Sequence, residues 1–255
     1  MSSDNMIEAF YDGLAPFYKW LHADWNASVA HQASILDGVI REFFGAHVRQ
    51  ILDAACGVGT QTLGLAELGY CLTASDISSA AIGQARDEAH QRSLVIDFRV
   101  ADMRQLWKVH QRTFDLIIAC DNAIPHLLSD ADILTALEQF HCCTVPGGGC
   151  IISVRDYAAM QRGGRQFYPR LIHDTDQGRM VLFDVWEFDG DYYDLTIFVV
   201  VDDGQAEAQT HVIRGGRYYC VSTETLEKLF RQAGFVDVRT LKGRFFQPLI
   251  VAQKA

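Results

Sequence analysis

Short apolar runs alternate with longer stretches of helical periodicity through the middle of the chain. In chain order the runs read VRQILDA, YCLTAS, LVIDFRV, FDLIIAC and GCIISV. Strands that alternate with helices pair in parallel, because each helix returns the chain to the same end of the sheet. We therefore expect residues 49–161 to form an α/β core of βαβ units around a parallel sheet.

The first 48 residues follow a different pattern. Their apolar positions have the spacing of a helix face, as at Ile35, Val39, Ile40, Phe43 and Phe44. Gly13 and Pro16 interrupt this pattern, which predicts several helices rather than one. We expect residues 1–48 to form an N-terminal helical cap ahead of the first strand.

Residues 162–221 change to alternating β-branched and aromatic positions, as in MVLFDVWEF and YYDLTIFVVV. Asp189-Gly190-Asp191 joins these two runs and is typical of a tight hairpin turn. The pattern predicts an inserted antiparallel β lid. Its aromatic and basic side chains line a substrate pocket, or else form cross-strand pairs and a homo-oligomer interface.

Residues 222–255 return to the core pattern. Ser222-Thr223-Glu224-Thr225 is a capped helix start, and FVDVRTL and FFQPLIVAQ follow it as two strands. We expect this C-terminal helix and β-hairpin to complete the core at the edge of the sheet.

Composition and charge narrow the classes of partner. The net charge of −10 repels phosphate backbones, so we expect no nucleic-acid partner. The sequence has no apolar stretch of about 20 residues and no basic leader, which predicts a cytoplasmic protein without a membrane partner. The seven cysteines contain no CxxC and no zinc-ligand spacing, so we expect reduced, mostly buried thiols and no metal.

The strongest local motif follows the first apolar run, where Asp53-Ala54-Ala55-Cys56-Gly57-Val58-Gly59 leads into a helix. Two glycines here let a ligand approach the backbone closely, although they could also merely close a tight turn. Asp76 ends the next run, about 20 residues after Gly57, where an acidic side chain can bind ribose hydroxyls. Together these residues predict a nucleotide-containing cofactor.

Two cofactors compete for this turn. A dinucleotide site reads GxGxxG, whereas this chain has Thr62 in place of the third glycine, which disfavours NAD. Asp53 ahead of the glycines suits an amino-acid ammonium group. The turn therefore favours S-adenosylmethionine, with an NAD-dependent oxidoreductase as an alternative.

As a set, the motifs resemble those of the class I methyltransferases over roughly residues 49–154. The glycine turn is similar to motif I of the family, and Ala74-Ser75-Asp76-Ile77-Ser78 is similar to its ribose-binding acidic loop. Ala101-Asp102-Met103 is similar to the adenine loop, and Val145–Gly149 to the turn before strand five. The resemblance implies a Rossmann-like, seven-stranded, mostly parallel sheet with an antiparallel last strand and helices on both faces.

The resemblance also implies the cofactor, S-adenosyl-L-methionine, with S-adenosyl-L-homocysteine as product. It places Asp53, Ala55 and Gly57 at the methionine moiety, Asp76 at the ribose, and Asp102 with the Met103 backbone at adenine. The other residues that we expect to bind the cofactor are Tyr18, Cys56, Gly59, Ile77, Cys120 and His126.

A narrower resemblance concerns the acceptor. Cys120–Leu127 and Val154–Tyr157 are similar to active-site segments of the glycine and sarcosine N-methyltransferases. This implies that Arg155 binds a substrate carboxylate, that Asn122 assists it, and that His126 contacts the cofactor. These three are the candidate catalytic residues, and Tyr11 and Tyr157 join Asn122 and Arg155 as candidate substrate-binding residues. Residues 20–40 hold no arginine to match the one in that group, which disfavours glycine itself.

Other interpretations of these residues stay open. Arg155 follows a central strand, at the edge of the sheet where α/β proteins bind ligands, and its guanidinium group can bind a carboxylate through two hydrogen bonds. It could instead pair with Asp156. His126 could stabilise its loop by hydrogen bonding rather than act in the reaction. Tyr11 and Tyr18 could face a sulfonium with their rings or simply pack among helices.

The sequence therefore predicts an S-adenosylmethionine-dependent methyltransferase whose acceptor is the amine of a small, carboxylate-bearing, glycine- or sarcosine-like metabolite. Methyl transfer is an in-line displacement, so such a site mainly aligns the reactants and excludes water. An O-methyltransferase using His126 as base and a non-catalytic S-adenosylmethionine-binding protein are the alternatives.

Overall fold

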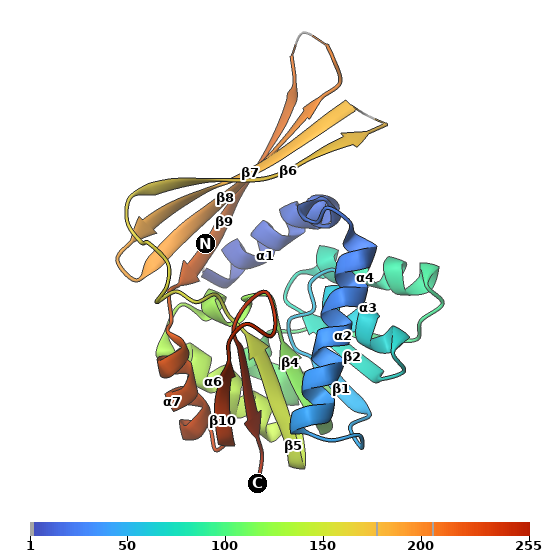
Figure 1. The fold of residues 1–255 in the computed structure, drawn as a ribbon, viewed down its shortest axis with the longest axis vertical. Helices are drawn as coiled ribbons and strands as arrows, with labels where there is room; N and C mark the ends of the chain where they lie inside the picture. The colour runs from blue at the N-terminus through green and yellow to red at the C-terminus, as the bar shows by residue number, and fades with distance from the viewer. Residues whose placement is uncertain (1–2, 177, 206) are drawn as a thin grey trace.

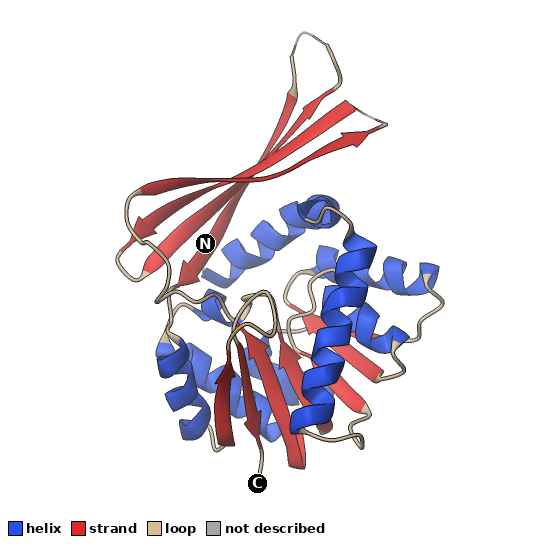
Figure 2. Ribbon diagram, in the orientation of Figure 1, coloured by secondary structure: helices blue, strands red, loops and turns tan. Residues whose placement is uncertain are grey.

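A computed structural model describes residues 3–176, 178–205 and 207–255 of the chain. The first two residues of the expected cap, and residues 177 and 206 of the expected insertion, lie outside this description. Two sheets lie one above the other, with an N-terminal helix between them (Figures 1 and 2).

Helices open the chain, as their periodicity predicts: α1 (Ser3–Leu14), the 3-10 helix η1 (Ala15–Leu21) and α2 (Trp25–Phe43). α1 ends just before Pro16, which cannot continue an α-helix. The Asp24 side chain caps α2 by accepting a hydrogen bond from the Ala27 amide in the first turn. α1 runs beneath the upper sheet, and α2 covers one face of the lower one (Figure 1).

The lower sheet has seven strands in the order β10-β11-β5-β4-β1-β2-β3. Its strands are β1 (Gln50–Asp53), β2 (Cys71–Asp76), β3 (Asp97–Val100), β4 (Phe114–Ala119), β5 (Thr144–Ser153), β10 (Val236–Leu241) and β11 (Leu249–Gln253). The first five pair in parallel, and β11 runs antiparallel between β10 and β5. This arrangement confirms the predicted Rossmann-like fold class.

Short helices connect these strands. They are α3 (Thr60–Glu67), α4 (Ser79–Gln91), η2 (Met103–Gln105), α5 (Leu106–His110), η3 (Ile124–Leu127), α6 (Asp130–Cys142) and α7 (Thr223–Gln232). Ser222 caps α7 through a bond from the Thr225 amide, as the sequence predicts.

The strands of the lower sheet bury both faces, which explains their continuous apolar runs. Ile51, Ile118 and Ile151 belong to the core that α2 covers. Leu52, Ile117 and Ile152 point the other way, into the core formed with α6 and α7. Because the carboxyl ends of the parallel strands meet at one edge of this sheet, the loops that follow β1, β4 and β5 come together under α1.

The upper sheet is separate, with four antiparallel strands in sequence order. They are β6 (Arg165–Thr175), β7 (Gly178–Asp189), β8 (Tyr192–Asp202) and β9 (Gln209–Tyr219). Gly190 takes a φ of 58° in the turn between β7 and β8, which confirms the predicted hairpin. Tyr193 and Tyr218 are buried on its inner face, toward α1, whereas Tyr192 lies on the opposite face.

Across residues 3–176, 178–205 and 207–255, no helix combines the length and apolar character needed to cross a bilayer. The division of the chain into four segments at residues 48, 161 and 221 stays a prediction.

Candidate active site

The turn after β1 is held in the left-handed backbone region that favours glycine. Gly57 has a φ of 52° and Gly59, the N-cap of α3, a φ of 97°. A Cβ added to Gly57 would meet nothing within 4 Å, so the space beside this turn is open. The Gly57 amide donates a hydrogen bond to Asp76 at 2.8 Å and thereby joins the two predicted motifs.

A narrow cleft lies beside this turn, between it and the N-terminal helices. Of the predicted site residues it is lined by Tyr11, Tyr18, Ala55, Cys56, Gly57, Asp76, Ile77, Asp102, Met103, Cys120 and His126. It is also lined by residues that we did not predict, among them Ile7, Gln61, Arg104 and Asp121. Asp53 and Gly59 do not line it.

Asp53 lies directly behind the cleft wall and is 1% exposed. Its carboxylate accepts hydrogen bonds from the Thr62 hydroxyl at 2.6 Å and the Ala55 amide at 3.3 Å. In the part of the chain that the structure describes, no cation pairs with it. Burial therefore raises the pKa of Asp53 to about 7.

Asp76 faces the cleft from the end of β2. One carboxylate oxygen accepts from the Gly57 amide and the other from the Ser78 amide at 2.9 Å. Burial raises the pKa of Asp76, against these backbone bonds, which lower it. Each oxygen keeps a second lone pair with which to accept a ligand hydroxyl.

Asp102 reaches the cleft with its carboxylate already engaged. It caps η2, and Arg104 donates to it at 2.6 Å. The predicted contact of the Asp102 side chain with adenine would therefore compete with an ion pair. Met103, next in the chain, lines the cleft without such a competitor.

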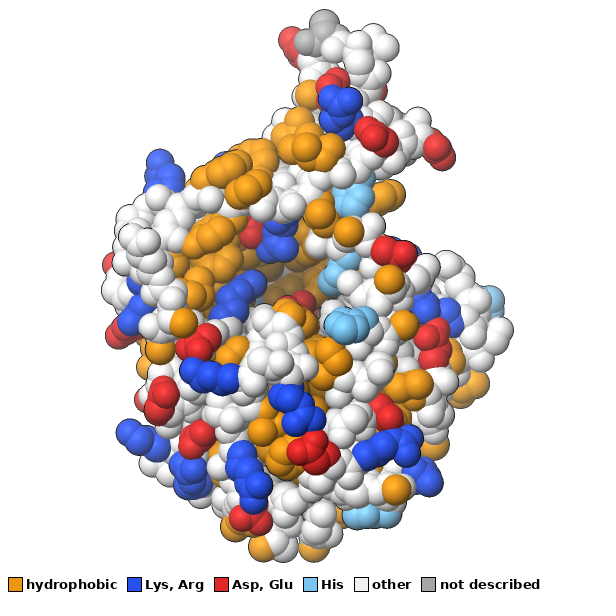
Figure 3. Space-filling model, viewed as in Figure 1, with side chains coloured by type: hydrophobic (Ala, Val, Ile, Leu, Met, Phe, Trp, Pro, Cys, Tyr) orange, Lys and Arg blue, Asp and Glu red, His pale blue; other side chains and the backbone are white. Residues whose placement is uncertain are grey.

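A second, larger cavity of about 740 Å³ lies between the upper sheet, the N-terminal helices and the loops after β4 and β5. Figure 3 shows the hollow under the upper sheet, with hydrophobic and basic side chains around it. Its polar lining includes Asp121, Arg155, Arg170 and Gln247, and its apolar lining includes Phe10, Leu14, Leu195 and Ile197.

Arg155 enters this cavity from the loop after β5. Its Nη1 donates to the Tyr193 hydroxyl at 2.7 Å, and its guanidinium lies over the Trp186 ring, 4.9 Å from the centroid. Among the described residues, no carboxylate lies within ion-pair distance of Arg155. Asp156, the alternative partner considered from the sequence, pairs with Lys242 instead, at 2.7 Å.

Asn122 and Tyr157 lie behind Arg155 rather than in the cavity. The Asn122 amide nitrogen donates to the Tyr157 hydroxyl at 2.8 Å, and its oxygen accepts from the Arg155 backbone at 3.0 Å. Both side chains are buried and neither lines the cavity. Their polar atoms fix the loop that carries Arg155, so the geometry favours a positioning role over the expected direct substrate contact.

His126 is bonded through both ring nitrogens. Nδ1 donates to the Arg217 carbonyl at 2.9 Å, so Nε2 accepts from the Tyr11 hydroxyl at 2.7 Å. Burial lowers the pKa of His126 to about 3. The imidazole is therefore neutral and fixes the Tyr11 hydroxyl in the cleft.

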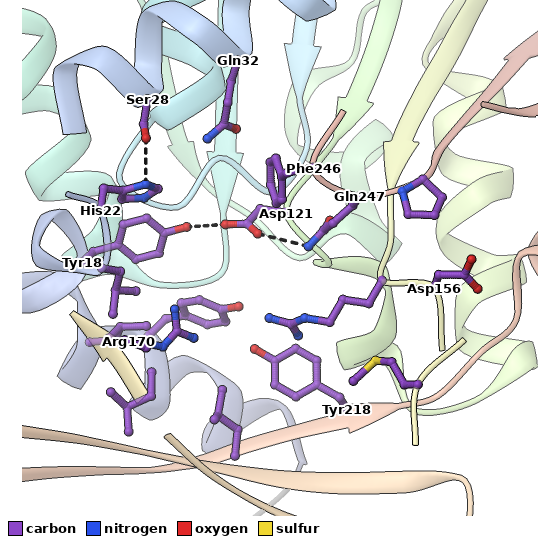
Figure 4. A pocket seen from close by; sticks show the side chains of 18 of the residues that line it. Tyr18, His22, Ser28, Gln32, Asp121, Asp156, Arg170, Tyr218, Phe246 and Gln247 are labelled. Atoms are coloured by element: carbon purple, nitrogen blue, oxygen red, sulfur yellow. Dashed lines mark hydrogen bonds between the residues drawn. The ribbon is translucent and has the colours of Figure 1, made fainter. Parts of the chain in front are cut away.

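Three residues line both cavities: Tyr11, Tyr18 and Asp121. The Tyr18 hydroxyl donates to Asp121 at 2.8 Å (Figure 4). The cleft and the larger cavity therefore meet at this point. Asp121 was not among the predicted site residues, although its position at the end of β4, beside Asn122, could have indicated it.

The other residues that we did not predict come from segments distant in sequence. Arg170 reaches the cavity from β6 and Gln247 from the loop before β11, beside Tyr218 of β9, an aromatic residue of the insertion for which a pocket position was one of the two expectations (Figure 4). Within the described residues, no group of three or more His, Cys, Asp or Glu side chains is arranged to hold a metal ion.

Comparisons with known proteins bear on this site. A family profile described as a methyltransferase domain matches residues 51–148. The glycine/sarcosine N-methyltransferase of Halorhodospira halochloris is 27% identical over 156 residues, 61% of this chain and 56% of that protein. The ubiquinone biosynthesis O-methyltransferase of Azoarcus sp. (strain BH72) is 26% identical over 105 residues, 41% of this chain and 43% of that protein.

The fold is also similar to solved structures. SAM-bound CalS10, an amino pentose methyltransferase from Micromonospora echinaspora, superposes with a TM-score of 0.77 at 18% identity, covering 89% of this chain and 92% of that one. The chain spans about half the length of the first three curated relatives that it matches, with 49–57% of each relative covered.

Proposed function

We propose that this chain, a class I S-adenosylmethionine-dependent methyltransferase, methylates the amine of a small, carboxylate-bearing molecule larger than glycine. The observation that carries the proposal is the meeting of the two cavities at Tyr11, Tyr18 and Asp121. The larger cavity also holds an arginine that forms no ion pair with any described residue. One cavity suits a nucleotide cofactor and the other suits an acceptor.

The narrow cleft fits S-adenosyl-L-methionine. Asp76 offers free lone pairs to ribose hydroxyls, and the open space at Gly57 admits a ligand close to the backbone. Asp53 is a buried carboxylate that a nearby ammonium group would stabilise. When bound there, the cofactor supplies the methyl group and its sulfur is the leaving group.

Arg155 is the proposed binding residue for the acceptor carboxylate. Tyr193 and Trp186 hold its guanidinium in place without neutralising it. A guanidinium fork binds a carboxylate through two parallel hydrogen bonds, which gives both affinity and orientation. Asn122 and Tyr157 act through Arg155, as positioning residues.

The size and lining of the larger cavity support an acceptor with an apolar side chain. Its volume of about 740 Å³ lies in the range of pockets for drug-sized ligands. Leu14 and Ile197 contribute apolar wall opposite the polar groups. Glycine has no side chain to fill this space, which agrees with the missing N-terminal arginine.

The chain's own residues contribute alignment and water exclusion. The Tyr11 hydroxyl is fixed by His126, and Tyr18 is fixed by Asp121, so both phenols stand in defined positions where the cavities meet. Such preorganised groups accelerate an in-line displacement by holding the reactants close together. The upper sheet, which forms one wall of the acceptor cavity, is the proposed lid.

A hydroxyl acceptor is the second candidate, because several of the relatives are O-methyltransferases. That reaction would need a base to deprotonate the hydroxyl, and His126 is poorly suited, since its pKa of about 3 leaves little proton affinity. A protein that binds S-adenosylmethionine without using it would share the cleft but would not require the second cavity.

The test is the formation of S-adenosylhomocysteine in three separate incubations: the twenty common amino acids, their N-acetyl derivatives, and a set of phenols. We expect turnover with free amino acids only, because N-acetylation delocalises the nitrogen lone pair into the amide carbonyl and leaves the carboxylate and side chain intact. Turnover with the phenols alone would favour the hydroxyl acceptor, and no turnover in any incubation would favour the non-catalytic protein.

We also propose a small molecule rather than nucleic acid as partner, which the net charge of −10 supports. The outer face of the upper sheet is the proposed contact with a second copy of the chain.

A further inference from the structure

Asp121 occupies the point through which an acceptor must face the cofactor cleft. It follows β4, and its side chain lines both cavities. Figure 4 shows it between Tyr18 and Gln247, with Tyr218 across the cavity. No other carboxylate of the described chain lines both cavities.

The Asp121 carboxylate retains capacity for a ligand. Tyr18 donates to one oxygen at 2.8 Å and Gln247 approaches the other at 3.4 Å. An ionised carboxylate has about four lone-pair positions, so two remain. Across the residues that the structure places, no lysine, arginine or histidine forms an ion pair with it.

The backbone holds this carboxylate in position. Asp121 and Asn122 both have positive φ, at 56° and 65°. The Asp121 amide donates to the Ser153 hydroxyl at 2.7 Å, and the Asn122 amide donates to the Ser153 carbonyl at 3.1 Å. Consecutive left-handed residues are uncommon away from glycine, and such conformations gather at functional sites.

The charged and titratable groups around Asp121 come from several elements. Tyr18 and His22 face it from η1 and the residue that follows, Arg155 from the loop after β5, and Tyr218 from β9. Arg170 from β6 lines the same cavity but pairs with Asp184 at 2.7 Å, and Arg155 is not in contact with Asp121. An unpaired carboxylate and an unpaired guanidinium in one cavity match the ammonium and carboxylate ends of an amino acid.

We propose that Asp121 binds the acceptor amine and receives the proton that this amine must lose. The inference rests on the proposed N-methylation and assigns a catalytic residue to it. Asp121 accepts a hydrogen bond from the amine, with the nitrogen toward the cofactor cleft and the acceptor carboxylate on Arg155.

The proton balance of the step is simple. An acceptor that enters as an ammonium ion passes one N–H proton to a carboxylate oxygen of Asp121, which frees the nitrogen lone pair. That lone pair forms the new N–C bond to the methyl carbon as the C–S bond breaks, and the bonding electrons of the C–S bond stay on sulfur. The methylated amine leaves protonated, or passes a second proton to solvent after Asp121 has released the first.

The test compares Asp121→Asn with Asp237→Asn, in the full-length protein. Asn keeps the shape of Asp and tolerates positive φ, so the loop can remain intact. Asp237 in β10 is a matched control, because it also has a positive φ, at 49°, and lines neither cavity. The readouts are turnover of the amino-acid pool across a pH series and the thermal shift caused by S-adenosylhomocysteine.

We expect Asp121→Asn to lower kcat/KM at pH 7 by about a hundredfold or more. The loss should shrink as pH rises, because alkaline solvent then deprotonates the amine in place of Asp121. The shift with S-adenosylhomocysteine should stay at the wild-type value, and Asp237→Asn should match wild type in both readouts.

Two outcomes would overturn the inference while leaving N-methylation standing: wild-type turnover in Asp121→Asn, or an equal loss at every pH. A loss of the thermal shift would also overturn it, because Asp121 would then act on the cofactor cleft. If the wild-type protein turns over no amino acid at all, the proposed function itself fails.

Discussion

At the scale of single residues, two buried charged groups without an oppositely charged partner in the described chain offer the best tests of the site. Among the residues that the structure describes, Asp53 is a carboxylate without a cation and Arg155 is a cation without a carboxylate. A protein does not gain stability from such unpaired charges, so we interpret each as the complement of a charged ligand group.

For Asp53 we predict pH-dependent binding of S-adenosylhomocysteine. The folded pKa of about 7 lies above the ordinary value of 3.8, so the protonated form favours the folded chain. This stabilisation is complete at low pH and is lost as pH rises from about 4 through about 7. Ligand binding has the opposite dependence, because the ammonium group needs an ionised Asp53.

Calorimetric titrations with S-adenosylhomocysteine check this prediction. They are made at roughly one-unit steps between about pH 5 and about pH 9, on both sides of the shifted pKa. Affinity should rise with pH and level off above about 7. Asp53→Asn should bind more weakly at high pH and lose the dependence. An unchanged pH profile in Asp53→Asn would show that another group is responsible.

For Arg155 we predict that Arg155→Met raises the KM for the amino-acid acceptor by roughly 10- to 100-fold, since a charge-assisted bond contributes about 1.5–3 kcal/mol. Binding of S-adenosylhomocysteine should not change. Steady-state kinetics check this, with Arg162→Met as control, because Arg162 forms a weak pair with Asp191 at 3.4 Å on the surface. An unchanged KM in Arg155→Met would exclude the proposed carboxylate contact.

At the scale of elements, the local patterns predicted the architecture and the long-range contacts did not follow from them. Apolar runs and glycine turns identified all five parallel strands and the hairpin at Gly190, because strand and turn preferences are local. The class I resemblance is confirmed by the domain match. Arg170 and Gln247 were not predicted, because the direction of their side chains depends on how distant elements pack.

The positions of Asn122 and Tyr157 behind the cavity also depend on contacts between distant elements. Their residue types and their place in the motif indicated a polar site, and the structure does place them beside Arg155. The sequence pattern cannot distinguish a side chain in a cavity from one directly behind it. That distinction depends on backbone dihedrals such as the positive φ of Asn122.

The contact between α1 and β9 gives a prediction about stability. A Cβ at Gly216 would lie 2.9 Å from the ring of Phe10, which is 1% exposed and has no room to move. Gly216→Ala should therefore destabilise the protein by about 1–3 kcal/mol. A Cβ at Gly83 in α4 would meet nothing within 4 Å, so Gly83→Ala should stabilise the protein slightly. Thermal unfolding of both variants checks this, and a Tm for Gly216→Ala at or above wild type would contradict the contact.

At the scale of the whole molecule, the upper sheet has an uncovered apolar face opposite the cavity. Pro169, Phe183, Phe198 and Val212 pair in one row across its four strands, and Phe183 stacks on Phe198 at 4.8 Å. Phe167 beside them is 62% exposed. A face of this kind can pair with its own copy around a two-fold axis.

We therefore predict a dimer that Phe183→Asp converts to a monomer. Light scattering coupled to size exclusion checks this, and Glu207→Lys in the loop before β9 is a surface control that should leave the dimer intact. Binding of S-adenosylhomocysteine should persist in Phe183→Asp, since this face lies away from the cleft. A monomeric wild-type protein would contradict the prediction.

We propose that the methyl group passes to an amine nitrogen where the two cavities meet. Tandem mass spectrometry after incubation with trideuteromethyl S-adenosylmethionine and the amino-acid pool tests it most directly, because fragment ions locate the label. We expect a labelled methyl on the nitrogen of an amino acid with an apolar side chain. A label on oxygen or carbon, or on glycine alone, would contradict it.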